Sequence, residues 1–153
     1  PLRRQRQMCI RDSDMTNSVE AINILTDTEI TDKEVWIVDD MIDTAGSVYT
    51  LVKELKNRGV GIVNIAVIHP VFSDPAMERL QELYESGMLN RLIVTDSLEV
   101  SDEIREAMPF LRVVSSARLS AEIIMRMHEE QSLSPFFDDF DPEHYLSNLK
   151  LFL

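Results

Sequence analysis

The stretch EVWIVDDMIDTAGSVYTLVKELKNRGVGIVNIAVI, residues 34–68, decides the fold of this chain. Its first part, EVWIV (34–38), is a short apolar, β-branched run of the kind that forms a buried parallel strand. Residues 47–58 place apolar side chains at helical spacing, and Gly59 stands where such a helix ends. Residues 62–68 are a second buried strand. The stretch therefore predicts a strand–helix–strand unit of a parallel sheet.

The rest of the chain continues the same alternation. Strands are predicted over 91–95 and 111–114, and a last helix over 118–129 with its apolar residues facing inward. Between them, Asp74 is expected to cap a helix whose first position is Pro75. The predicted fold is α/β: three layers, with a mostly parallel sheet of about four to six strands, the first of them central, and helices on both faces.

Composition narrows the classes of function. The chain has 153 residues, enough for one domain with its own core, and a net charge of -12. That charge excludes a general nucleic-acid or anionic-membrane surface. No run approaches the ~18 apolar residues of a membrane span, and the basic start lacks the apolar run of a signal peptide. Cys9 is the only cysteine, which precludes an internal disulfide and favours a reducing, cytoplasmic location.

The loop after the first strand carries the candidate chemistry. Asp39 and Asp40 end the predicted strand. A turn of small residues then leads into the helix: Asp43, Thr44, Ala45, Gly46 and Ser47. Small side chains and the free N–H groups of a helix start suit a phosphate monoester, whereas paired carboxylates suit vicinal hydroxyls or Mg²⁺. Either feature alone is more often a solvated loop or an ordinary cap, but their succession without a gap favours a ribose phosphate site.

The segment DDMIDTAGS (39–47) resembles the phosphoribosyl-diphosphate loop of type I phosphoribosyltransferase-like proteins. Its amino-acid sequence is most similar to that of the corresponding loop in the ribose-phosphate diphosphokinases. AVIHPVFSDPAMERL (66–80), RLIVTDSL (91–98) and the segment 111–137 resemble the strands and helices that follow in that family. The likeness covers residues 17–137 and identifies the chain as similar to the C-terminal half of such an enzyme.

The resemblance implies roles for the loop. Asp39 and Asp40 would hold the ribose hydroxyls together with a Mg²⁺ ion, and residues 43–47 would surround the 5-phosphate. In the family, O1 of ribose 5-phosphate attacks the β-phosphorus of MgATP, which gives phosphoribosyl diphosphate and AMP. The family binds ATP mainly through its N-terminal half and a neighbouring subunit. The resemblance thus implies a homo-oligomer, and a chain that is inactive alone.

The sequence departs from the family near its start. The family carries Lys-Arg-Arg on a flexible catalytic loop, and the matching residues here are Leu2, Arg3 and Arg4. Arg4 keeps the implied catalytic charge, whereas Leu2 cannot replace the lysine.

Three segments are expected along the chain. Residues 8–13 resemble a translated sequencing adapter, and the chain begins with Pro, so we expect a fragment whose native sequence resumes near Met15. The expected segments are a doubtful loop over 1–14, a phosphoribosyltransferase-like domain over 15–137, and an acidic, aromatic tail over 138–153.

Two alternative functions stay open. A phosphoribosyltransferase that consumes phosphoribosyl diphosphate would need a hood for a nucleobase, and none is visible in the sequence. A non-catalytic regulatory homologue of the diphosphokinase is favoured by Leu2 and opposed by the intact loop at 39–47.

His69, at the end of the second strand, either faces the ligand or caps the strand end.

Overall fold

The computed structural model describes residues 8–10, 23–25 and 29–136. The chain divides into two compact units, Pro1–Ser115 and Ser116–Leu153. The boundary between them falls inside the domain that the sequence predicts over residues 15–137.

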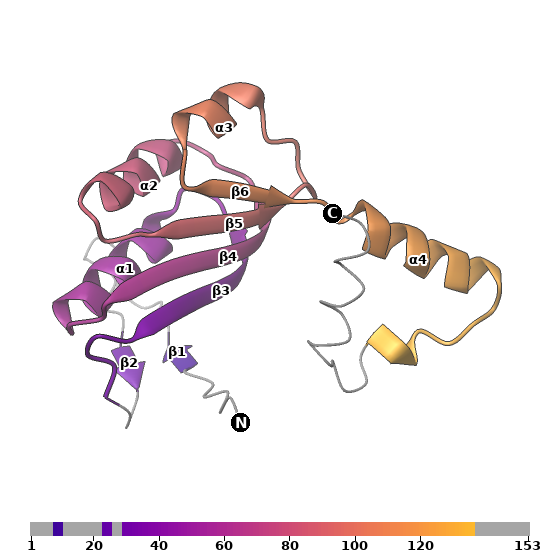
Figure 1. The fold of residues 1–153 in the computed structure, drawn as a ribbon, viewed down its shortest axis with the longest axis horizontal. Helices are drawn as coiled ribbons and strands as arrows, with labels where there is room; N and C mark the ends of the chain where they lie inside the picture. The colour runs from indigo at the N-terminus through magenta and orange to yellow at the C-terminus, as the bar shows by residue number, and fades with distance from the viewer. Residues whose placement is uncertain (1–7, 11–22, 26–28, 137–153) are drawn as a thin grey trace. The chain divides into compact units, whose positions relative to one another are not determined.

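A four-stranded parallel sheet forms the centre of the first unit (Figure 1). Its strands are adjacent in chain order: β3 (Glu34–Ile42), β4 (Ile62–Pro70), β5 (Arg91–Thr95) and β6 (Leu111–Val114). The α/β class and the parallel sheet are confirmed, and β5 and β6 have the predicted bounds. A separate antiparallel pair, β1 (Met8–Ile10) with β2 (Asn23–Leu25), was not predicted.

Two predictions about the first strand are wrong. Within the described residues β3 is an edge strand of the sheet, not a central one. It also continues to Ile42, because its parallel pairing with β4 persists beyond the apolar run and joins Asp39 to Val67 and Met41 to His69. Asp39 and Asp40 consequently lie inside the strand rather than at its tip.

Two helices pack on one face of this sheet. α1 (Gly46–Asn57) and α2 (Ala76–Glu85) lie together on the same side of the strands in Figure 1. The buried side chains between helices and sheet form one apolar core: Val48, Val52 and Leu55 of α1, Leu80 and Leu83 of α2, and Val63, Ile65, Val67, Leu92 and Val94 of the strands. Burial of each of these aliphatic side chains stabilises the fold by roughly 1.5–3 kcal/mol. The core therefore fixes the positions of the strands and helices that carry the loops at the sheet's carboxyl edge.

Some predicted helix details are wrong. Asp74 does not cap α2, whose N-cap residue is Pro75 and whose start has no side-chain cap. Tyr84 was predicted from its helical spacing to belong to the apolar stripe of this helix, but it is exposed and stacks on Phe110 with ring centroids 4.5 Å apart. The short helix α3 (Asp102–Ala107) was not predicted.

The opposite face of the sheet is rich in exposed apolar residues. Trp36, Val38, Ile68 and Val114 alternate along their strands with inward-facing core residues. We call these four residues the open sheet face. Val38 is 77% exposed and Trp36 is 44% exposed, so Trp36 is not a core residue.

The second unit contains α4 (Ala117–His128) and the 3₁₀ turn η1 (Ser134–Phe136) in its described part. The predicted inward stripe of α4 is not buried there, since Leu119, Ile124 and Met127 are exposed. Arg126 connects the two elements, with its guanidinium 5.3 Å from the centre of the Phe136 ring. No helix in the described part of either unit combines the length and apolar character needed to cross a bilayer.

Charged and polar side chains join α1 to α2. The Tyr49 hydroxyl donates to Glu82 Oε1 at 2.5 Å, and Lys53 Nζ lies 3.0 Å from the same oxygen and also contacts the Tyr49 hydroxyl. The hydrogen bond from Tyr49, and then that from Lys53, lowers the pKa of Glu82 below its ordinary 4.5. The bond to Tyr49, and then that to Glu82, raises the pKa of Lys53 above 10.5.

These two shifts predict a pH dependence of stability. A carboxyl whose pKa is lowered on folding stabilises the fold above its unfolded pKa, and that stabilisation is lost as the pH falls through the folded pKa. We expect wild-type stability to fall below about pH 4.5, and Glu82→Gln to flatten this fall while lowering stability at neutral pH. The raised Lys53 pKa predicts the opposite limit, with stabilisation lost as the pH rises above about 10.5.

Urea unfolding between pH 3 and 11 measures this dependence. Glu78→Gln is the control, because Glu78 is an exposed residue of the same helix and the substitution removes the same charge. The effect is modest because the pair is exposed to solvent. Identical pH profiles for wild type and Glu82→Gln would show that this cluster does not contribute.

Candidate active site at the carboxyl end of β3

The structure brings all of the predicted ligand-binding residues of the β3–α1 segment together. A pocket of about 440 Å³ is lined by residues 39–48, which include Asp39, Asp40 and the whole turn from Asp43 to Ser47. Its volume falls in the range of about 300–1,000 Å³ typical of small-molecule sites. The pocket lies at the carboxyl edge of the sheet, where open α/β folds bind their ligands.

The turn presents backbone donors rather than charged side chains. Ala45, the N-cap residue of α1, is left-handed with φ 58° and ψ 13°, and the right-handed helix starts at Gly46. A left-handed residue followed by a right-handed one turns successive N–H groups toward a common point, which makes a concave anion site. No acceptor among the described residues takes the N–H groups of Ala45 and Gly46. Ala45 occupies a left-handed position that glycine usually takes.

Asp39 and Asp40 are both among the residues that line this pocket. Both are exposed, and Asp39 Oδ1 accepts a hydrogen bond from the Asp40 N–H at 2.9 Å. In the part of the chain that the structure describes, no group of three His, Cys, Asp or Glu side chains gathers around a possible metal. The two exposed carboxylates beside the pocket are hard oxygen donors, and the pocket has room for ligand oxygens or water. This chemistry fits Mg²⁺, which usually keeps several waters.

Arg79 of α2 holds the turn from behind. Its Nη1 donates to the Thr44 carbonyl oxygen at 2.8 Å, in a partly buried position. A Cβ placed on Gly46 would lie 3.2 Å from the same Nη1. Arg79 is not among the residues predicted from the sequence, and spacing gives no signal for it, because only the fold brings α2 to this loop.

The comparisons with known proteins agree on one family. The family model described as the phosphoribosyl synthetase-associated domain matches residues 10–138. The chain belongs to this family. It is 39% identical over 121 residues to the ribose-phosphate pyrophosphokinase of Synechococcus elongatus, covering 79% of this chain and 34% of that protein. It is 36% identical to that of Campylobacter jejuni, covering 79% of this chain and 36% of that protein.

A solved structure supports the fold of this synthetase-family chain. The phosphoribosylpyrophosphate synthetase from Mycobacterium smegmatis matches with a TM-score of 0.64 and 33% identity, covering 74% of this chain and 35% of that one. The resemblance to the ribose-phosphate diphosphokinases, another name for the pyrophosphokinases, is confirmed. The chain spans about a third of the length of these relatives.

Other predicted residues lie elsewhere. Arg4, with Leu2 and Arg3, is outside the described residues. His69 is paired in register with Met41, and its Nδ1 lies 2.9 Å from Ser97 Oγ. Because the Ser97 hydroxyl donates its proton to Ile68 O at 2.9 Å, it accepts from His69, which places the imidazole proton on Nδ1. His69 therefore links the carboxyl ends of β4 and β5, as the interpretation of a strand-end residue expects.

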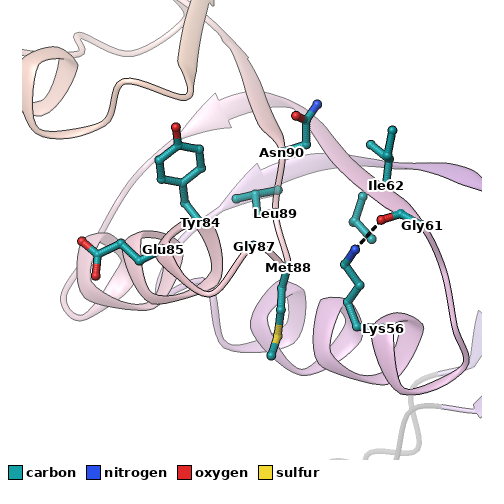
Figure 2. Close-up of a pocket in the computed structure, with 10 residues that line it drawn as sticks. Lys56, Gly61, Ile62, Tyr84, Glu85, Gly87, Met88, Leu89 and Asn90 are labelled. Atoms are coloured by element: carbon teal, nitrogen blue, oxygen red, sulfur yellow. Dashed lines mark hydrogen bonds between the residues drawn. The ribbon is translucent and has the colours of Figure 1, made fainter.

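A second pocket, of about 470 Å³, lies at the opposite end of the strands (Figure 2). The residues that line it come from the start of β4 and from the segment just before β5. Lys56, Tyr84 and Glu85 also line it. The Lys56 ammonium is already engaged there, since it donates to the carbonyl oxygens of Val60 and Gly61. Because parallel sheets bind ligands at their carboxyl ends, the pocket at residues 39–48 is the stronger candidate.

Proposed function

We propose that this chain supplies the ribose 5-phosphate site of a ribose-phosphate diphosphokinase. The observation that carries the proposal is the pocket at residues 39–48, where an array of backbone donors adjoins two carboxylates, in a chain of this family. The donor array suits the 5-phosphate, and the carboxylates suit the ribose hydroxyls. In the proposed reaction a bond forms between O1 of the sugar and the β-phosphorus of MgATP. The bond from that phosphorus to AMP breaks, and the hydroxyl proton leaves to solvent.

The chain's own residues would act by placement. The N–H groups of Ala45 and Gly46 would bind the phosphate, and Asp39 and Asp40 would orient the sugar so that O1 faces the incoming phosphorus. A Mg²⁺ ion held with these carboxylates would supply charge neutralisation to the transferred group. Arg4 is proposed to add positive charge there.

The rest of the active site is proposed to come from outside this chain. We propose that ATP is bound mainly by the part of the protein that the relatives have beyond the matched third, and by a neighbouring subunit. The open sheet face, with its exposed apolar side chains, supports a homo-oligomer. A single cysteine supports a cytoplasmic location. Leu2, in place of the family's lysine, favours a regulatory homologue as the second candidate.

Calorimetry with ribose 5-phosphate and with ribose tests the proposal. We expect ribose 5-phosphate to bind about tenfold or more tighter than ribose, as one or more charged hydrogen bonds would produce, with Mg²⁺ strengthening the binding. With MgATP added, the chain alone should form no phosphoribosyl diphosphate. Equal affinity for the two sugars would reject the phosphate role of residues 43–47.

A further inference from the structure

The contact between Arg79 and the turn sets the direction of one peptide group. The Thr44–Ala45 peptide is trans, so its carbonyl and its N–H point in opposite directions. The Thr44 carbonyl is directed at the Arg79 guanidinium, which donates to it at 2.8 Å. The Ala45 N–H is therefore directed away from α2, on the side where residues 39–48 line the pocket.

The same guanidinium also lies under the start of α1. Its Nη1 would be 3.2 Å from a Cβ on Gly46, so the glycine permits this close approach. One turn further along α2, Glu82 contacts Tyr49 and Lys53 of α1. α2 thus connects to the turn through Arg79 and to the body of α1 through Glu82. Both contacts therefore fix the turn and α1, which line the pocket, to α2.

A left-handed alanine needs such support. Leaving the left-handed region would relieve roughly 1–2 kcal/mol at Ala45, so its conformation persists only where its surroundings impose it. The bond from Arg79 to Thr44, together with burial of Ala45, supplies that constraint. Arg79 is not among the described residues that line the pocket, so its effect reaches a ligand through the turn.

We propose that Arg79 is a positioning residue for the anion site: it holds the Thr44–Ala45 peptide in the orientation that presents the Ala45 N–H to a phosphate. The inference rests on the proposed function, because it assumes that residues 43–47 bind the 5-phosphate. It predicts an effect on phosphate recognition in particular, since Asp39 and Asp40 belong to β3 and do not depend on this bond.

Binding of ribose 5-phosphate and of ribose to Arg79→Met provides the test. We expect the affinity for ribose 5-phosphate to fall about tenfold, as for loss of one charged hydrogen bond, while the affinity for ribose stays unchanged. Arg105→Met is the matched control, because Arg105 Nε donates to the Val100 carbonyl oxygen at 3.1 Å, beside α3. That variant should keep the preference for the phosphate.

A double-mutant cycle with Gly46→Ala tests the contact itself. The new methyl meets the guanidinium in the wild type but not in Arg79→Met, so Gly46→Ala should weaken ribose 5-phosphate binding less in the Arg79→Met background. If Arg79→Met does not fold, Arg79→Lys replaces it, and the same reduced effect of Gly46→Ala is expected. Strictly additive losses would overturn the inference.

The outcomes separate this inference from the proposed function. If the wild type prefers ribose 5-phosphate to ribose and the Arg79 variants keep that preference within twofold, the role of Arg79 is wrong and the proposed function stands. If the wild type shows no preference, both are wrong. If the Arg79 variants lose affinity for both sugars equally, Arg79 has a general structural role and the positioning role is rejected.

Discussion

Gly46→Val is expected to abolish detectable binding of ribose 5-phosphate while the fold survives. A branched side chain at this position stands at the start of α1, beside the N–H groups of Ala45 and Gly46 that face the pocket. Its Cβ would meet Arg79 Nη1, so the valine would displace the guanidinium that holds the turn, and with it the N–H groups that would bind the anion. Loss of two charged hydrogen bonds at about 1.5 kcal/mol each corresponds to roughly a hundredfold loss of affinity.

The fold should survive because the strain is local. Gly46 does not have a positive φ, so its backbone conformation is open to any residue. The nearest atoms to an added Cβ belong to the side chains of Arg79 and Thr44, at 3.2 and 3.7 Å, and both can move. In helix propensity valine is also no worse than the glycine that it replaces.

Calorimetry with circular dichroism measures both parts of this expectation. Gly46→Ala is the graded comparison, because it adds only the first carbon of the valine side chain and should retain part of the affinity. A folded Gly46→Val protein with near-normal affinity would mean that residues 43–47 do not bind phosphate.

Asp40→Asn is expected to act on the metal instead of the phosphate. The substitution keeps the shape and some hydrogen bonding of the side chain but removes a negative charge and a hard oxygen ligand. The strengthening of ribose 5-phosphate binding by Mg²⁺ should fall about tenfold, roughly the value of one charged contact. The preference for ribose 5-phosphate over ribose should persist, because the donors of the turn are unchanged.

Titrations with and without Mg²⁺ test this expectation. Asp102→Asn, which makes the same change in charge on α3, is the control and should leave the Mg²⁺ effect intact. Asp39→Asn is an informative companion, since its amide oxygen can still accept the Asp40 N–H. A full Mg²⁺ effect in Asp40→Asn would exclude Asp40 as a metal ligand.

The sequence predicts those parts of the fold that depend on local patterns. Strands β5 (RLIVT) and β6 (LRVV) are short segments rich in β-branched and apolar residues, and the sequence pattern predicts their limits. The end of β3 could not be predicted in this way, because Asp39 and Asp40 interrupt the apolar run after Val38 while backbone pairing with β4 continues to Ile42. α3 has six residues, too few for a periodic pattern, and its only local signals are the Ser101 cap and two acidic residues in its first turn.

The same distinction explains what was found and missed at the site. Residues 39–47 are contiguous, so one strand, one turn and one helix start place them together. Arg79 lies 35 residues after Thr44 and reaches it only because the connection after β4 returns α2 alongside α1. The left-handed position fell on Ala45 because tertiary contacts can override the usual preference for glycine.

The open sheet face also provides an optical signal. Trp36 is the only tryptophan in the chain, and its indole N–H donates to Glu34 at 2.9 Å while much of the ring faces water. Indole fluorescence moves to shorter wavelength when water leaves the ring. The emission colour of an unlabelled sample therefore reports whether another surface covers this face, and a dilution series would follow that event without any engineered probe.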